Sequence, residues 1–144
     1  MITDASTLLS NAQAITATAA STNIIDLGAT GTVFGAAAAL TRDIGKGVAI
    51  PFKVAVVETF NNLTSLTISI ETDDNAGFGS AATVWTSIAY PLADLATGKR
   101  LLLPDSLPLG VNERYVRLKY TVAGTAPTTG KITAGVTMGN QTNG

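Results

Sequence analysis

The stretch Glu113–Gly139, ERYVRLKYTVAGTAPTTGKITAGVTMG, decides the fold class of this chain. In its first half, apolar and polar side chains alternate with a period of two, which is typical of a strand with one buried face. The alternation resumes after a turn-rich break at residues 124–130, and the two runs together predict an antiparallel hairpin. The side chains expected to face inward are Val116, Leu118, Tyr120, Val122, Ile132, Ala134, Val136 and Met138.

Shorter segments with strand character occur throughout the rest of the chain. Residues 48–60 are apolar at almost every position, and residues 63–72 alternate, with Leu66, Ile68 and Ile70 expected inside. Asn61 and Asn62 predict a turn that would join these two strands as a second hairpin. Residues 29–47 are rich in Gly and Ala and predict a long loop, with one helical turn at residues 36–40. Further short strands are expected at residues 21–28, 82–88, 90–95 and 99–103.

Seven or eight short strands without an amphipathic helical window predict an all-β fold, an antiparallel β-sandwich. The pattern alone does not separate a jelly roll from an immunoglobulin-like topology, although the paired Cys of the latter are absent. A length of 144 residues indicates one domain. We expect an extended N-terminal arm at residues 1–20, a sandwich domain at residues 21–139 and a C-terminal tail at residues 140–144.

The composition excludes several classes of function. The net charge is −1, the pI is near 5.2, and the five lysines and four arginines are scattered, so we expect no nucleic-acid binding. Without His or Cys the chain lacks the commonest general base and any thiolate, so we expect no enzyme and no cofactor. No apolar run is long enough to cross a bilayer and no secretory signal is evident, so we expect no membrane partner and synthesis in a cytoplasm.

Asp73 and Asp74, followed by Asn75 and Gly77, are the only arrangement that suggests a metal. Carboxylate and amide oxygens on a tight turn are ligands for a hard cation, but the alternate spacing and closing Glu of a calcium loop are missing. The same residue types are what an ordinary β-turn prefers. A turn is therefore the favoured interpretation, no metal site is predicted, and a cation at this position stays open.

Three sets of side chains are candidates for contact with another protein. Tyr115 and Arg117 are expected on the outer face of one strand, a combination enriched at interfaces, although an ordinary sheet exterior would show it too. Phe34, in the Gly- and Ala-rich loop, could anchor that loop to its own core or to another subunit. Leu8 and Leu9 could drape the N-terminal arm over a partner, or the arm could be a frayed terminus.

The chain resembles the capsid cement, or decoration, proteins of tailed bacteriophages of the type first described in a Bordetella phage. Four segments in order along the chain carry the resemblance: NAQAITATAASTNIIDLG, RDIGKG at residues 42–47, VAVVETFNNLTSLTISIETDD and ERYVRLKYTVAGTAPTTGKITAG. These segments are patterns of strands and turns and contain no catalytic signature. The segment 29–41 is longer than expected between IDLG and RDIG, so no detail of that loop is carried over.

The resemblance implies a jelly roll and a structural role in the virion. Such a protein would be a homodimer on the outer surface of the capsid, made in the host cytoplasm, and would bridge neighbouring capsomers of the major capsid protein. The low share of charged residues, 13%, suits a surface that other proteins cover. The residues expected at such interfaces are Leu8, Leu9, Phe34, Arg42, Tyr115 and Arg117.

The alternative from another class is a carbohydrate-binding sandwich module of a phage tail or a secreted protein. Such modules present a line of exposed Trp and Tyr side chains for stacking on sugar rings. Trp85 is the only Trp, and it lies in an apolar strand context, which argues against this alternative.

Overall fold

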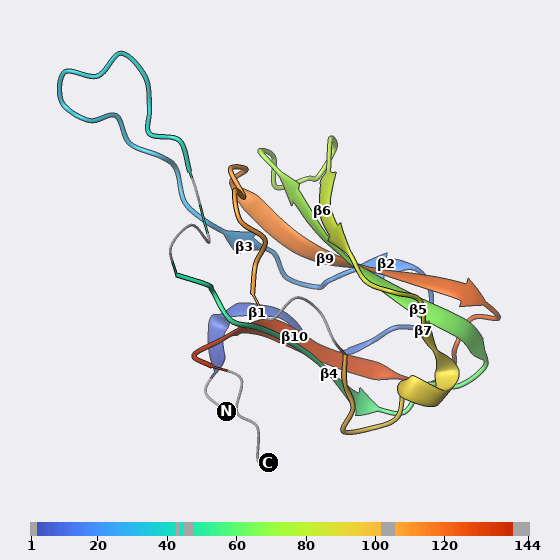
Figure 1. The fold of residues 1–144 in the computed structure, drawn as a ribbon. Helices are drawn as coiled ribbons and strands as arrows, with labels where there is room; N and C mark the ends of the chain where they lie inside the picture. Colours follow the sequence, from blue (N-terminus) through green and yellow to red (C-terminus); the bar gives the residue numbers. More distant parts are fainter. Residues whose placement is uncertain (1–2, 43, 45–47, 102–105, 140–144) are drawn as a thin grey trace.

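The protein is a sandwich of two antiparallel β-sheets, seen in a computed structural model that describes residues 3–42, 44, 48–101 and 106–139 (Figure 1). One sheet contains β1 (Thr3–Ala14), β10 (Lys131–Thr137), β4 (Phe52–Glu58) and β8 (Arg100–Leu101), in that order. The other contains β2 (Ala19–Ala20), β3 (Ile25–Asp26), β9 (Tyr115–Gly124), β5 (Leu63–Asp73), β6 (Ala82–Thr86) and β7 (Tyr90–Pro91). A 3₁₀ turn, η1 (Leu92–Asp94), is the only helical element in these residues.

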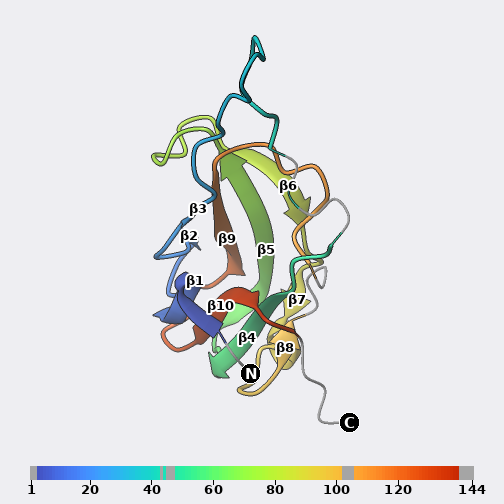
Figure 2. The same ribbon diagram turned by 90° about the vertical axis from the view of Figure 1, so that its left-hand side faces the viewer.

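The strand order is that of a jelly roll, which confirms the predicted fold class. In the six-stranded sheet β2 and β3 both pair with β9, and β6 and β7 both pair with β5, so each pair acts as one interrupted strand. Each sheet then has four strand positions, and the chain passes repeatedly from one sheet to the other (Figures 1 and 2). A jelly roll is the double-sheet solution that wraps two Greek keys around one core.

Both predicted hairpins are wrong. β9 pairs with β5 and β10 pairs with β4 and β1, so the two halves of the stretch 113–139 lie in opposite sheets. β4 and β5 are likewise in opposite sheets, although Asn62 makes the expected tight turn with a φ of 64°. The apolar faces of successive strands meet across the core instead of side by side. Alternation reports which face of a strand is buried, and it does so equally for strands that pair and for strands that stack.

The connection between β9 and β10 crosses from one sheet to the other, and its conformation requires a glycine at residue 130. Gly130 has a φ of 131°, and a Cβ atom at this position would lie only 2.3 Å from the ring of Phe60. Phe60 is 3% exposed and sits in the neighbouring crossing between β4 and β5. The two crossings therefore pack directly on each other, and only a residue without a side chain fits at this point.

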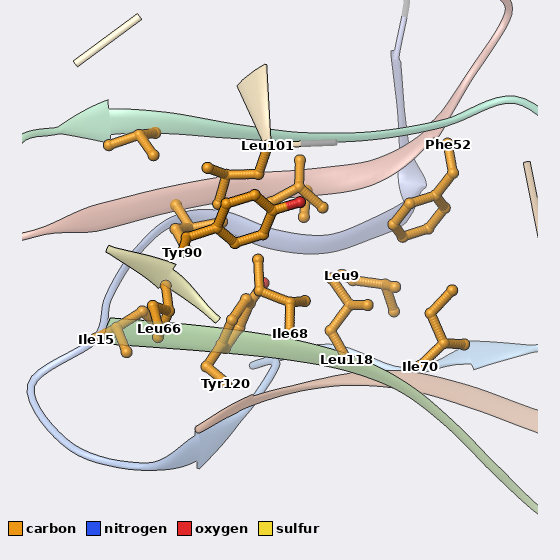
Figure 3. Packing of buried hydrophobic residues seen from close by; sticks show 14 of the residues in the cluster. Leu9, Ile15, Phe52, Leu66, Ile68, Ile70, Tyr90, Leu101, Leu118 and Tyr120 are labelled. Carbon is orange, nitrogen blue, oxygen red and sulfur yellow. The ribbon is translucent and has the colours of Figure 1, made fainter. Parts of the chain in front are cut away.

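The core lies between the sheets and consists of the predicted inward side chains of both (Figure 3). On β5 and β9 the pairs Ile68↔Tyr120 and Ile70↔Leu118 are completely buried, as predicted. The prediction fails at Met138, which lies just beyond the end of β10 and is 82% exposed. The strand pattern therefore gives the core correctly as far as the ladders extend.

Most of the segment predicted as an N-terminal arm is extended, as the edge strand β1 of the four-stranded sheet. Leu9 and Ile15 are completely buried, and the Ser10 hydroxyl lies 2.7 Å from the Tyr120 hydroxyl of the opposite sheet. Burial raises the pKa of the Tyr120 phenol, which stays neutral and can bond to Ser10. The sandwich therefore begins within residues 1–20, whereas the predicted tail, residues 140–144, lies outside the described residues.

Candidate functional site

The most prominent surface feature is a protruding loop, residues 29–41, which leaves the sandwich after β3 (Figures 1 and 2). Its described backbone contains no helical turn at residues 36–40, contrary to the prediction. Instead the two limbs approach each other, with the amide of Leu40 donating to the Gly31 carbonyl at 2.9 Å. At the tip the amide of Ala36 donates to the Val33 carbonyl at 2.9 Å, which closes a turn. The loop is thus a projection of two limbs that a backbone hydrogen bond joins, without regular secondary structure.

The tip of the protruding loop displays a large apolar side chain to solvent. Phe34 is 105% exposed, and Val33 and Leu40 are 54% and 58% exposed. Gly35 has a φ of 82°, a conformation that suits the third position of a tight turn and places Phe34 at its apex. None of the residues 29–41 is charged. Exposed apolar groups that cluster without charges mark sites where another surface is expected to bind.

Arg42 holds the base of this loop. Its guanidinium donates hydrogen bonds to the Asn112 carbonyl at 2.7 Å and to the Gly28 carbonyl. These bonds join the start of the loop, its end and the segment before β9. The predicted interface residue Arg42 therefore has a positioning role in the described structure, because its hydrogen bonds tie the loop to the domain.

An ion pair supports the base of the loop from the six-stranded sheet. Arg114 donates from Nε and Nη2 to the two carboxylate oxygens of Asp26, both at 2.7 Å. These bonds lower the pKa of Asp26 to about 2, and the Asp26 carboxylate also accepts the amide of Gly28 at 2.8 Å. The Arg114 guanidinium also lies 5.0 Å from the centre of the Tyr115 ring. Tyr115, a predicted interface residue, is thus half-buried beside this ion pair.

Arg117 is committed to contacts within its own chain. Its Nε and Nη2 lie 2.8 and 2.7 Å from Oε2 of Glu71, whose side chain is only 5% exposed. The ring of Phe78 stacks over the guanidinium at 4.1 Å, and Lys119 lies 3.5 Å from the other carboxylate oxygen of Glu71. The Arg117 side chain is 21% exposed. On the outer face of β5 and β9, Arg117, Lys119 and Glu71 therefore form an ion-pair cluster within the chain. The ring of Phe78 covers the Arg117 guanidinium of this cluster.

The loop that carries Phe78, residues 74–80, folds back onto the sheet and is closed by Asp73. The Asp73 carboxylate accepts the amides of Asn75 and Ser80, both at 2.8 Å, and these bonds lower its pKa. This confirms the interpretation of Asp73 and Asp74 as part of a turn. In the described part of the chain no three acidic side chains gather in a way that could hold a metal ion.

Leu8 and Leu9 separate to the two sides of β1. Leu9 is completely buried in the core, so its side chain cannot contact a partner in this structure, which corrects its assignment to an interface. Leu8 points outward and lines an apolar hollow of about 230 Å³ on the outer face of the four-stranded sheet, together with Ala55, Val57 and Gly135. The alternation of a strand dictates this split, because neighbouring side chains leave on opposite faces.

The six predicted residues therefore occupy distinct places. Phe34 and Arg42 share the protruding loop and its base, and Tyr115 lies close by, opposite Asp26 in the β3–β9 ladder. Arg117 is under Phe78, Leu8 is on the other sheet and Leu9 is in the core.

Sequence reasoning missed Asp26, Arg114, Glu71 and Phe78. Glu71 faces Arg117 across the ladder, and opposite charges on alternating strands were the available signal.

The aromatic residues do not form a sugar-stacking platform. Among the residues that the structure describes, Phe34 is the only exposed aromatic side chain, and Trp85 is partly buried against the core. Within the residues that the structure describes, no helix has the length and apolar character to cross a bilayer.

Comparison with known proteins agrees with the resemblance found in the sequence. No curated protein matches the chain. The family model Bbp16 matches residues 9–136, from the middle of β1 almost to the end of β10. This match includes the protruding loop and all of the sandwich except the first half of β1 and the last residue of β10. The chain therefore belongs to the Bbp16 family, a family of Bordetella phage protein.

Proposed function

We propose that this chain is a structural virion protein, a cement protein that binds the outer surface of a tailed-phage capsid. In this role it clamps neighbouring capsomers of the major capsid protein and acts as a homodimer. The role is mechanical and needs no catalytic group or cofactor. Family membership supports a phage protein, and the observation that carries the finer proposal is the protruding, uncharged loop with Phe34 fully exposed at its tip.

The energetics of the loop favour insertion of its apolar tip into an apolar pocket on a partner protein. Burying a Phe side chain contributes about 1.5–3 kcal/mol, and aromatic residues are enriched among the side chains that dominate interface energies. Because residues 29–41 carry no charge, the loop can leave water without the cost of desolvating an ion. The hydrogen bonds of Arg42 hold the limbs of the loop together, which reduces the entropy lost on binding.

The rest of the molecule suits a passive clamp. The core is continuous, the ion pairs of the six-stranded sheet are satisfied internally, and the net charge of −1 gives no attraction to the DNA inside a capsid. A dimer that grips two capsomers gains avidity, because its second contact is effectively intramolecular. Weak single contacts can then add up to stable decoration of the shell.

Co-sedimentation with undecorated capsids tests this function. We expect saturable binding at a fixed number of copies per capsid and a higher temperature of capsid disruption after binding. A glycan array serves as the control for the carbohydrate-binding alternative and should show no signal. Failure to bind undecorated capsids at micromolar concentration, or selective binding to a glycan, would contradict the proposal.

A further inference from the structure

A polar hollow of about 430 Å³ lies at the base of the protruding loop. Both limbs of the loop form part of its wall, and the segment before β9 and the loop after β5 form the rest. The polar side chains that line it are Thr30, Thr41, Arg42, Asp74, Asn112 and Arg114. The loop that displays Phe34 at its tip therefore has charged and hydrogen-bonding groups at its base.

The guanidinium of Arg42 brings a positive charge to this hollow without an ion pair. Arg114, in the same lining, holds the two carboxylate oxygens of Asp26. Both hydrogen bonds of Arg42 go instead to backbone carbonyl groups. Within residues 3–42, 44, 48–101 and 106–139, no carboxylate lies within ion-pair distance of Arg42. A guanidinium has five N–H groups, so the two bonds leave three of them for another acceptor.

Three uncharged side chains of the lining also have hydrogen-bonding groups to spare. The hydroxyl groups of Thr30 and Thr41 and the side-chain amide of Asn112 form no hydrogen bond with any described residue. Thr30 and Thr41 belong to opposite limbs of the loop, so these groups lie on different walls of the hollow. A small anionic group between them can accept charge-assisted hydrogen bonds from Arg42 and further bonds from its neighbours.

The charges around the hollow favour one carboxylate over a more highly charged group. The planar fork of a guanidinium matches the two oxygens of a carboxylate. Asp74 also lines the hollow, and its own carboxylate repels any second negative charge. Arg114 adds no net charge, because Asp26 pairs with it. One positive charge, that of Arg42, is therefore available to a ligand.

We infer that this hollow binds the carboxylate of an Asp or Glu side chain on the major capsid protein, beside the apolar pocket that receives Phe34. The inference rests on the proposed function and deepens it, since it names a second feature of the partner surface. The apolar tip forms the centre of the contact, and the hollow is part of its polar rim, as is usual in protein interfaces. Arg42 then both holds the loop and binds the acidic side chain.

A carboxylate supplied by the loop itself tests the inference. Ala39 lines the hollow, so Ala39→Glu places a carboxylate there, and Ala39→Gln is a control of the same size without the charge. In co-sedimentation with undecorated capsids, Ala39→Glu should bind about fivefold more weakly than Ala39→Gln, which is the loss of one ion pair at an interface rim. Circular dichroism and thermal unfolding check that both variants fold.

The salt dependence of binding gives a second readout from the same variants. Raising NaCl from about 50 to about 500 mM should weaken capsid binding by wild type and Ala39→Gln, because salt screens an exposed ion pair. Ala39→Glu should be less sensitive to salt, since its Arg42 is already paired within the chain. An identical salt dependence for Ala39→Glu and Ala39→Gln would contradict the inference.

Carbodiimide coupling identifies the acidic side chain directly. The reagent joins an amine to a carboxylate that it contacts, and Thr41→Lys introduces an amine at the hollow while Arg42 stays in place. With capsids present, mass spectrometry should find a cross-link from position 41 to an Asp or Glu of the major capsid protein. Lys53, on the other sheet, is the internal control and should give none. Cross-links from position 41 only to this chain's own carboxylates would contradict the inference.

These results separate the inference from the proposed function. If neither wild type nor Ala39→Gln binds capsids, the proposed function is overturned, and this inference with it. If wild type binds capsids, Ala39→Glu and Ala39→Gln bind equally, and position 41 gives no cross-link to the capsid protein, the inference alone is overturned.

Discussion

Two loops of this protein each carry a phenylalanine, and the structure treats them in opposite ways. Phe78, in residues 74–80, is 7% exposed and covers the Arg117–Glu71 ion pair, whereas Phe34, in residues 29–41, is 105% exposed. The loop of Phe78 is closed by the Asp73 carboxylate, and that of Phe34 is held only near its base and by turns in its own backbone. The first loop completes its own domain, and the second leaves apolar surface for another molecule to cover.

The largest expected effect is on stability, at Phe78. Phe78→Ala removes the ring from a buried ion pair and should lower the free energy of unfolding by about 2–4 kcal/mol. Phe78 also has a left-handed φ of 51°, a strained conformation that its burial and the bond from its amide to the Asn75 carbonyl, at 3.0 Å, offset. Urea unfolding measures the change, with Phe34→Ala as the matched control, expected within about 0.5 kcal/mol of wild type. Equal destabilisation by the two substitutions would remove the contrast between the loops.

For capsid affinity we expect the reverse order, with a larger effect of substitution at Phe34 than at Phe78. Phe34→Ala is expected to weaken binding to undecorated capsids by about 10- to 100-fold, which corresponds to the loss of one buried Phe side chain. Quantitative co-sedimentation measures this loss. Leu109→Ala is the matched control, because Leu109 is also a large exposed apolar residue, at 74%, outside the protruding loop. Wild-type affinity in Phe34→Ala would show that the tip does not enter the partner.

A smaller effect is expected at the base of the protruding loop. Arg42→Ala removes the hydrogen bonds to Asn112 and Gly28 and should weaken capsid binding by about 3- to 10-fold, since a looser loop loses more entropy on binding. Lys53→Ala removes one positive charge on the other sheet and controls for the change in net charge. If both substitutions reduce affinity equally, charge and not loop geometry is the cause.

The smallest expected effect is the acid sensitivity of the Asp26–Arg114 pair. The pKa of Asp26 is about 2 in the folded chain, below its ordinary value of 3.8, because Arg114 bonds to the ionised form. The stabilisation from this pair is therefore complete above about pH 4 and is lost as the pH falls towards 2. The difference in melting temperature between wild type and Asp26→Asn should shrink over this window. A difference that stays constant from pH 6 to pH 2 would contradict this assignment.

The core could be predicted because the alternation of apolar and polar side chains shows which face of each strand is buried. Ile68, Ile70, Leu118 and Tyr120 are all in the core, as their period of two required. Pairing could not be predicted in the same way. β9 is apolar on one face whether it pairs with β10 or stacks against it, and the short breaks at residues 59–62 and 124–130 were compatible with both.

The sequence indicated which types of residue the candidate site would use, but it did not indicate where in the fold each of them lies. Phe34 was notable as an aromatic residue in a Gly- and Ala-rich segment, and it is indeed exposed. Tyr and Arg are residue types enriched at interfaces, which favoured Tyr115 and Arg117. In the structure, however, the Arg117 guanidinium bonds to Glu71 and stacks on Phe78 of the same chain. Leu8 and Leu9 are adjacent in sequence, and only the position of β1 at the edge of a sheet decides which one enters the core.

By itself the sequence determined that this chain is a sandwich of short strands without His, Cys or a charged loop tip, because composition and side-chain periodicity are local properties. Only the tertiary structure decided which strands share a sheet and which phenylalanine is covered. These depend on contacts between segments far apart in the chain, where a choice between pairing and stacking changes no local pattern.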